Sequence, residues 1–174
     1  ERVLKLDVEN HFGLYGKIEC LFRLRRTDEA IKNALENSKL HPDKRAYQDL
    51  LGMAYLALGN YSKAERAFSK SIEIQPDSVY AYANLSVALQ RQAKTNEAIN
   101  ILQQGLQIRS SSWLYNNLAN IYFFRGDYLE AVNAFEAALS PRLGNANDYL
   151  AWANLADAQL WVPGKKREAI KNYN

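Results

Sequence analysis

The sequence predicts an all-α protein, a right-handed α-solenoid of tandem helix-turn-helix units. Three observations lead to this prediction. Pro42 and Pro76 lie 34 residues apart in the matching contexts KLHPD and EIQPD. An alanine and a leucine-containing segment each recur at nearly the same interval. A period of this length is typical of chains that stack one supersecondary unit repeatedly.

The alanine series marks the second helix of each unit. Each alanine follows a Glu or Lys, in the tripeptides DEA, SKA, NEA, LEA and REA, at intervals of 34, 34, 33 and 38 residues. Its members are Ala30, Ala64, Ala98, Ala131 and Ala169. Pro42 and Pro76 follow this series at the point where the second helix must stop, because proline lacks the backbone N–H that a helix interior needs.

The leucine-containing segments mark the first helix of each unit and the turn that follows it. They begin with LLGMAY, NLSVAL, NLANIY and NLADAQ and cover Leu50–Tyr61, Asn84–Thr95, Asn117–Tyr128 and Asn154–Lys165. The turns carry Gly59-Asn60 and Gly126-Asp127. Glycine suits a left-handed helix C-cap, and Asn or Asp suits the N-cap of the next helix.

This pattern resembles the tetratricopeptide repeat, which has about 34 residues with Leu-Gly, Tyr, Gly, Ala, Phe and Pro at fixed offsets. The best match is Leu51, Gly52, Tyr55, Gly59, Tyr61, Ala64, Phe68 and Pro76, and the next is Tyr115, Leu118, Ala119, Tyr122, Gly126, Tyr128, Ala131, Phe135 and Ala138. The unit between these two matches lacks the turn glycine and the closing proline. The resemblance implies a superhelix that binds proteins without catalysis.

We expect a degenerate N-terminal repeat with a lead-in over residues 1–44, followed by an array over residues 45–174. The array units are about 45–78, 79–111, 112–147 and 148–174, and the last is incomplete, so Ile170 and Tyr173 should be exposed. In the lead-in, alternating Leu4, Leu6 and Val8 indicate a short strand or an extended segment.

Composition narrows the function classes. A net charge of +3 is spread over scattered Lys and Arg, so nucleic-acid binding is not expected. The single cysteine, Cys20, excludes an intrachain disulfide framework, and its helical context predicts a buried or half-buried thiol. No apolar run long enough for a membrane span is present, and the compartment stays unassigned. The start at Glu1 leads us to expect a piece of a longer protein.

Catalytic signatures are absent from the sequence. It contains no GxxxxGK[ST], GxSxG, HExxH or CxxC motif. His11 and His41 are expected to be solvated or capping residues. We therefore expect no enzyme activity and no cofactor. The inserted loops and the phrase NLADAQLW resemble the C-terminal repeat regions of some bacterial signalling proteins, so a regulatory or substrate-recruiting arm of a larger enzyme is an alternative interpretation.

The residue before each motif leucine points away from the core, about 100 degrees around the helix. It is Leu50, Asn84, Asn117 or Asn154, so three units of four carry asparagine there. Residues four positions before and three and seven positions after each of these lie on the same side of the helix. Together they predict one recognition face of amides flanked by aromatic residues. The predicted peptide-binding residues are Tyr80, Asn84, Arg91, Trp113, Asn117, Asn120, Phe124, Asn154 and Trp161.

A carboxamide donates and accepts together, so it can pair with both polar groups of a peptide main chain. By resemblance, Asn84, Asn117 and Asn154 match the asparagine ladder with which some tetratricopeptide superhelices hold peptides. The competing interpretation is that these residues only bridge helices or are hydrated. Capture of a C-terminal carboxylate is disfavoured, because the face offers Arg91 alone. Self-association or intramolecular docking through the C-terminal edge is the other alternative.

Overall fold

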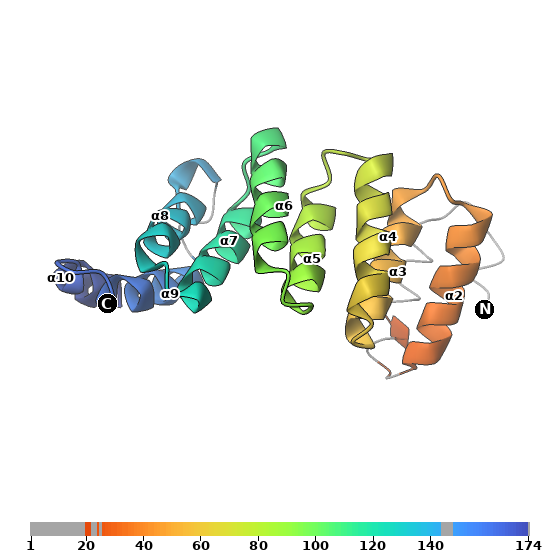
Figure 1. The fold of residues 1–174 in the computed structure, drawn as a ribbon, viewed down its shortest axis with the longest axis horizontal. Helices are drawn as coiled ribbons and strands as arrows, with labels where there is room; N and C mark the ends of the chain where they lie inside the picture. The colour runs from red at the N-terminus through yellow and green to blue at the C-terminus, as the bar shows by residue number, and fades with distance from the viewer. Residues whose placement is uncertain (1–19, 22–23, 25, 144–147, 174) are drawn as a thin grey trace. The chain divides into compact units, whose positions relative to one another are not determined.

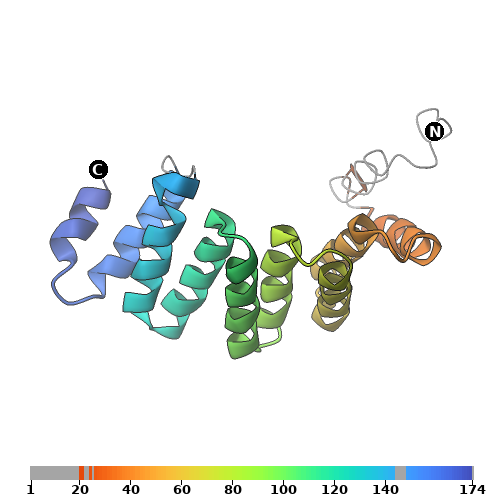
Figure 2. The same cartoon turned by 90° about the horizontal axis from the view of Figure 1, so that it is seen from above.

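The computed structural model describes residues 20–21, 24, 26–143 and 148–173, and the structural statements below concern these residues. They form helices joined by short turns, without a strand among them. Figure 1 shows consecutive helices in each unit running in opposite directions, and Figure 2 shows them from above. The chain divides into two compact units, residues 1–93 and 94–174. The extended lead-in predicted around Leu4 lies outside the described residues.

The described residues of the first unit form four helices, and each packs against the next in the chain. They are α2 (Thr27–Leu40), α3 (Arg45–Ala57), α4 (Tyr61–Ile74) and α5 (Val79–Gln90). One core cluster joins Leu21, Ala30, Ala34, Tyr47, Leu50, Leu51 and Ala67. Leu50 is only 2% exposed. The prediction that Leu50 points away from the core is therefore wrong, because α3 packs against both α2 and α4.

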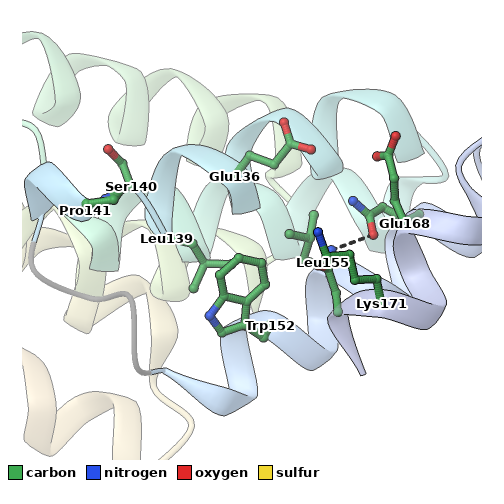
Figure 3. A pocket seen from close by; sticks show the side chains of 10 residues that line it. Glu136, Leu139, Ser140, Pro141, Trp152, Leu155, Glu168 and Lys171 are labelled. Carbon is green, nitrogen blue, oxygen red and sulfur yellow. Dashed lines mark hydrogen bonds between the residues drawn. The ribbon is translucent and has the colours of Figure 1, made fainter. Parts of the chain in front are cut away.

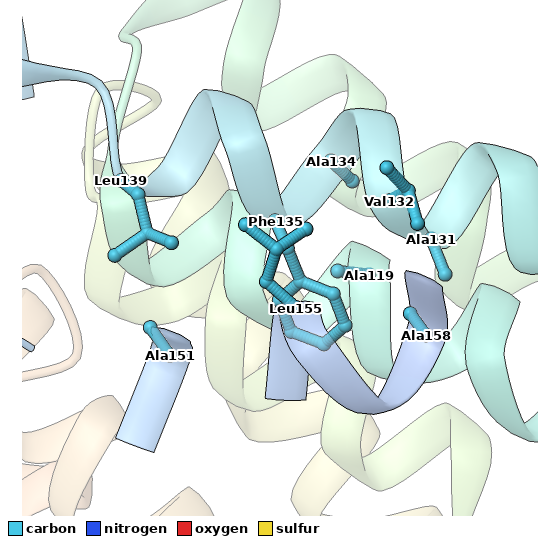
Figure 4. Packing of buried hydrophobic residues seen from close by; sticks show 9 residues of the cluster. All are labelled: Ala119, Ala131, Val132, Ala134, Phe135, Leu139, Ala151, Leu155 and Ala158. Atoms are coloured by element: carbon cyan, nitrogen blue, oxygen red, sulfur yellow. The ribbon is translucent and has the colours of Figure 1, made fainter. Parts of the chain in front are cut away.

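In the second unit, residues 94–143 and 148–173 form five helices and one turn of 3-10 helix. They are α6 (Thr95–Ile108), α7 (Ser112–Arg125), α8 (Tyr128–Ala138), η1 (Pro141–Leu143), α9 (Tyr149–Leu160) and α10 (Lys166–Asn172). In its core, Phe135 of α8 lies among small side chains such as Ala119 of α7 and Ala158 of α9 (Figure 4). This cluster joins α7, α8 and α9 into one packed layer.

The alanines of the repeat series are all completely buried. A residue with no side chain beyond Cβ lets neighbouring helices approach closely, and a larger one would force them apart. Gly52 marks an even closer approach between two helices. A Cβ added to Gly52 would lie 2.6 Å from Cζ of Phe68, whose ring is fully buried. Helices α3 and α4 therefore need glycine at this contact.

The turn glycines adopt the predicted left-handed conformation. Gly59 has φ of 71° and Gly126 has φ of 91°. The middle repeat, which lacks this glycine, instead places Ala93 at φ of 61°. Asn60 and Asp127 occupy the predicted N-cap positions, but neither side chain makes a capping hydrogen bond. Asp127 instead accepts a hydrogen bond from Arg125.

Side-chain capping occurs at two other helix starts. The hydroxyl of Ser78 accepts a hydrogen bond from the backbone N–H of Ala81 at the start of α5, at 3.3 Å. The carboxylate of Asp148 accepts one from the N–H of Ala151 at the start of α9, at 3.0 Å. Both residues precede the first helix of a repeat, so these caps fix where the first helices begin.

Polar contacts tie the end of a first helix to the second helix of the preceding repeat. Gln92 contacts Glu65 and Ser62 at 2.7 and 3.1 Å. Arg125 donates to Asn96 at 3.3 Å, and Lys165 contacts Glu136 at 3.4 Å. Such contacts occur in three consecutive repeats, at Gln92, Arg125 and Lys165.

Cys20 departs from its prediction. It is exposed, not buried or half-buried. The next residue, Leu21, packs into the core cluster of the first unit.

Candidate functional site

Helix α7 presents the predicted amide and aromatic side chains on one side. Trp113 is 43% exposed and Phe124 is 84% exposed. Asn117 and Asn120 between them are half-buried. Leu114, Leu118 and Ile121, about 100 degrees around the same helix, are buried. Exposure of an apolar ring to water is unfavourable, and burial against a partner protein removes this cost. The exposed side of α7 is therefore typical of a binding surface.

Helix α9 repeats this arrangement in the same unit. Asn154 is half-buried, and Trp161 at the C-terminal end of the helix is 63% exposed. Leu150, one turn before Asn154, is also exposed, whereas Leu155 is buried. Asp157 lies between Asn154 and Trp161 and is the charged residue of this stripe.

Four aromatic residues form a row from the end of α7 to the end of α9. Phe123 meets Phe124 edge to face at 5.7 Å and Tyr128 at 5.6 Å between ring centroids. Tyr128, at the start of α8, stacks on Trp161 at 5.3 Å with 16° between the ring planes. We call Phe123, Phe124, Tyr128 and Trp161 the aromatic row. It brings two predicted anchors, Phe124 and Trp161, into one connected set.

Tyr80, Asn84 and Arg91 lie on α5 in the first unit. Arg91 is exposed, and Tyr80 and Asn84 are half-buried. The amide nitrogen of Asn84 donates a hydrogen bond to the backbone carbonyl of Tyr80 at 2.9 Å. One donor of this predicted ladder residue is therefore used within its own helix.

Asn116 is a polar residue that the sequence argument set aside. Its side-chain oxygen is buried and has no hydrogen-bond partner among the described residues. Its repeat-equivalents in α5 and α9 are Ala83 and Ala153. Helical register places Asn117 on the predicted face and Asn116 off it, but the sequence gave no signal that the side-chain oxygen of Asn116 is buried.

The first unit contains a buried carboxylate that the sequence argument also missed. Asp49 of α3, which is 3% exposed, accepts hydrogen bonds from Arg45 and from the hydroxyl of Ser71. Desolvation by burial raises the pKa of Asp49, and the Ser71 hydrogen bond and the Arg45 charge oppose that rise. Arg45 also donates to Gln75 at 2.8 Å and to Ser78 at 3.2 Å. This network ties the loop between α4 and α5 to α3.

A cavity of about 390 Å³ lies where α8, η1, α9 and α10 meet (Figure 3). Leu139, Trp152 and Leu155 provide its apolar side, and Glu136, Glu168 and Lys171 provide charged groups. At one side Asn172 donates a hydrogen bond to Gln159 at 2.9 Å. The residues predicted from sequence as binding residues do not line it.

Two negative findings hold for the described part of the chain. There, no group of three or more His, Cys, Asp or Glu side chains is placed to hold a metal ion. Nor is any helix in that part both long and apolar enough to cross a membrane.

Sequence comparison finds tetratricopeptide repeat models at residues 50–78, 67–100 and 112–140. Tetratricopeptide repeat protein 13 of Homo sapiens is 29% identical over 117 residues, which are 64% of this chain and 14% of that protein. Aspartyl/asparaginyl beta-hydroxylase of Mus musculus is 25% identical over 113 residues, 65% of this chain and 15% of that protein. The matched regions thus span about a seventh of these relatives.

Solved structures share the fold at low sequence identity. MamA superposes with a TM-score of 0.75 and 22% identity, covering 90% of each chain. A thermophilic TPR protein of Thermus thermophilus superposes with a TM-score of 0.71 and 20% identity, covering 94% of this chain and 88% of that one.

The paired helices and their recurring buried alanines define the class: this is an α-solenoid protein built from helical repeats. The chain belongs to the tetratricopeptide repeat family, whose models match it at residues 50–100 and 112–140. It is a protein–protein interaction module of that family.

Proposed function

We propose that the second unit binds an extended peptide segment of a partner protein along the exposed side of α7 and α9. The observation that carries the proposal is that both helices place a half-buried asparagine, Asn117 or Asn154, beside exposed aromatic residues. Amides give the peptide main chain donors and acceptors, and the aromatic rings give its side chains apolar surface.

The aromatic residues would supply most of the affinity. A neutral hydrogen bond contributes a net stabilisation of only about 1 kcal/mol. Burial of an aromatic side chain at an interface contributes more, and such residues are often the hot spots. We assign Trp113, Phe124 and Trp161 this anchoring role, and Asn117, Asn120 and Asn154 the main-chain contacts.

Tyr80, Asn84 and Arg91 would form a separate contact surface on α5 of the first unit. Arg91 is exposed and has a cationic side chain for an acidic residue of the partner. We propose no catalytic step for either unit. The proposal also includes no nucleic-acid partner.

The test is a binding measurement with the double variant Asn117→Ala plus Asn154→Ala. A peptide array first identifies a binding peptide, and fluorescence anisotropy then gives its Kd for the natural chain and the variant. The loss of two main-chain contacts should weaken binding by roughly tenfold or more, at about 1 kcal/mol for each hydrogen bond. The matched control is Asn133→Ala, because Asn133 is an exposed asparagine on α8 of the same unit.

Urea unfolding accompanies the binding measurement. Equal affinity of the natural chain and the double variant, at equal stability, would refute a role for the two amides. A loss of affinity that the Asn133→Ala control shares would refute it as well.

Self-association is the second proposal, and the exposed residues of α10 favour it. Ile170 and Tyr173 are 57% and 51% exposed, as the sequence predicted. Sedimentation velocity at several concentrations distinguishes the two functions. A monomer at every concentration removes self-association and leaves the peptide proposal intact.

A further inference from the structure

Trp161 is held in place before any partner arrives. Tyr128 covers one face of its indole ring in a nearly parallel stack. Because Trp161 remains 63% exposed, the other ring face is open to solvent. Tyr128 also packs edge to face with Phe123. A fixed aromatic face in water is a surface on which a cation can stack.

Asp157 places a negative charge one helical turn before Trp161, on the same side of α9. The hydroxyl of Tyr173 donates a hydrogen bond to the carboxylate of Asp157. This hydrogen bond is the largest cause of the raised pKa of Tyr173, followed by burial and then by the negative charge of Asp157. In the described part of the chain, no basic side chain forms an ion pair with Asp157.

Lys165 and Arg125 have other partners. Lys165 pairs with Glu136 and Glu168 at 3.4 and 3.3 Å. Arg125 binds Asp127 and lies over the ring of Tyr122 at 5.3 Å. Helix α7 thus supplies a cation to its own aromatic side chain.

Helix α9 supplies no such cation. Val162 follows Trp161 where Arg125 follows Phe124 in α7. An exposed indole ring and a carboxylate without an ion-pair partner among the described residues therefore lie one helical turn apart at the end of α9. This pair complements a planar cation that can stack and donate hydrogen bonds at once, which is the chemistry of arginine.

We propose that Trp161 and Asp157 form a binding site for an arginine side chain of the partner peptide. The guanidinium group stacks on the open indole face and donates to the Asp157 carboxylate. The site rests on the proposed peptide-binding function, for which it defines one side-chain specificity. It predicts that peptides bound by the second unit carry arginine at the position that meets the end of α9.

The test uses N-acetyl-arginine amide as the probe and the indole N–H signals of the whole chain in NMR spectra. Trp161→Leu identifies the Trp161 signal. Arginine amide should shift this signal in a saturable way, and N-acetyl-citrulline amide, which is neutral and nearly isosteric, should bind at least fivefold more weakly. Asp157→Asn should weaken arginine binding by about fivefold, the effect of an exposed charge pair.

Glu136→Gln is the matched control, because it removes one carboxylate from a residue that already pairs with Lys165. It should leave arginine binding within twofold. Equal binding of arginine and citrulline amides, or an unchanged Kd in Asp157→Asn, would overturn the arginine site.

The failures of the two proposals are distinguishable. Asn117→Ala plus Asn154→Ala removes the amides but leaves Trp161 and Asp157 in place. If the amide contacts are wrong, this double variant keeps its peptide affinity while the arginine probe still shifts Trp161. If the arginine site is wrong, N-acetyl-arginine amide does not shift the Trp161 signal of the natural chain in a saturable way, and this result does not depend on whether the peptide binds.

Discussion

Helix α3 in the first unit and helix α7 in the second are first helices of repeats, and their equivalent positions carry different side chains. Where α3 has Asp49 and Leu50, both buried, α7 has Asn116 and Asn117, both only partly buried. Ala57 is the last residue of α3, and its equivalent in α7 is Phe124, which is 84% exposed. One backbone plan thus supports a packed helix in one unit and the proposed binding face in the other.

The difference teaches that the repeat signature specifies the packing and leaves the outer positions free. Residues of the signature, such as Leu51 and Leu118, are buried in both helices. The positions between them vary without changing the fold. Exchanging residues between equivalent positions therefore tests which side chains hold each unit together and which face a partner.

The largest expected effect comes from Gly52, whose equivalent in α7 is Ala119. Gly52→Ala would place a methyl group 2.6 Å from the buried ring of Phe68, so α3 and α4 must separate. We expect a loss of about 1–3 kcal/mol in the free energy of unfolding, measured with urea. In a Phe68→Leu background the same substitution should cost less than half as much. If Gly52→Ala leaves the free energy of unfolding unchanged, then α3 and α4 can pack around an alanine as α7 and α8 pack around Ala119.

The next effect concerns the turn between α7 and α8. Gly126 has φ of 91°, a conformation that costs an L-residue roughly 1–2 kcal/mol. Gly126→Ala should lower the free energy of unfolding by about that amount. Gly126→Asn should cost less, because asparagine tolerates left-handed backbone better than alanine. Equal costs for the two substitutions would show that backbone conformation is not the cause.

The substitution Asn116→Ala should stabilise the protein, unlike the two glycine substitutions. The side-chain oxygen of Asn116 is buried without a partner, and asparagine is a poorer helix former than alanine. Asn116→Ala should raise the free energy of unfolding by about 1 kcal/mol. The alanines at its equivalent positions in α5 and α9 show that the repeat accepts this side chain. Asn133→Ala, at an exposed helix position, reports the helix-propensity part alone, and a gain no larger than this control would contradict the explanation.

The sequence predicted the helical repeats and the turn glycines, because these depend on contacts that recur with the period of the chain. It predicted the exposed rings of Trp113, Phe124 and Trp161 for the same reason. It did not predict the burial of Leu50 or the Asp49 network. Both depend on which neighbouring helix packs against α3, and a single periodic pattern does not encode that. The stack of Trp161 on Tyr128 also joins two repeats and has no local signal.

A smaller effect is expected at Ala93, which occupies the turn position where its equivalents have glycine. Its φ of 61° is unfavourable for alanine. Ala93→Gly should raise the free energy of unfolding by roughly 0.5–1 kcal/mol, since the relief of strain exceeds the added freedom of the unfolded chain. Ala57→Gly, at an exposed position in right-handed helix, should instead lower it by a similar amount. A loss of stability at both sites would show that Ala93 is not strained.

The smallest effect is a difference in pH dependence between the natural chain and Asp49→Asn. Burial raises the pKa of Asp49 in the folded state above 3.8. As the pH rises from about 4 through that raised pKa, the folded protein holds a proton that the unfolded chain has released, so the contribution of Asp49 to stability falls. The asparagine side chain of the variant does not titrate, and every other group is common to both proteins. The free energy of unfolding of the natural chain minus that of Asp49→Asn should therefore decrease with rising pH. Urea unfolding at several pH values measures this difference, and an increase would show that the Arg45 charge outweighs the desolvation of Asp49.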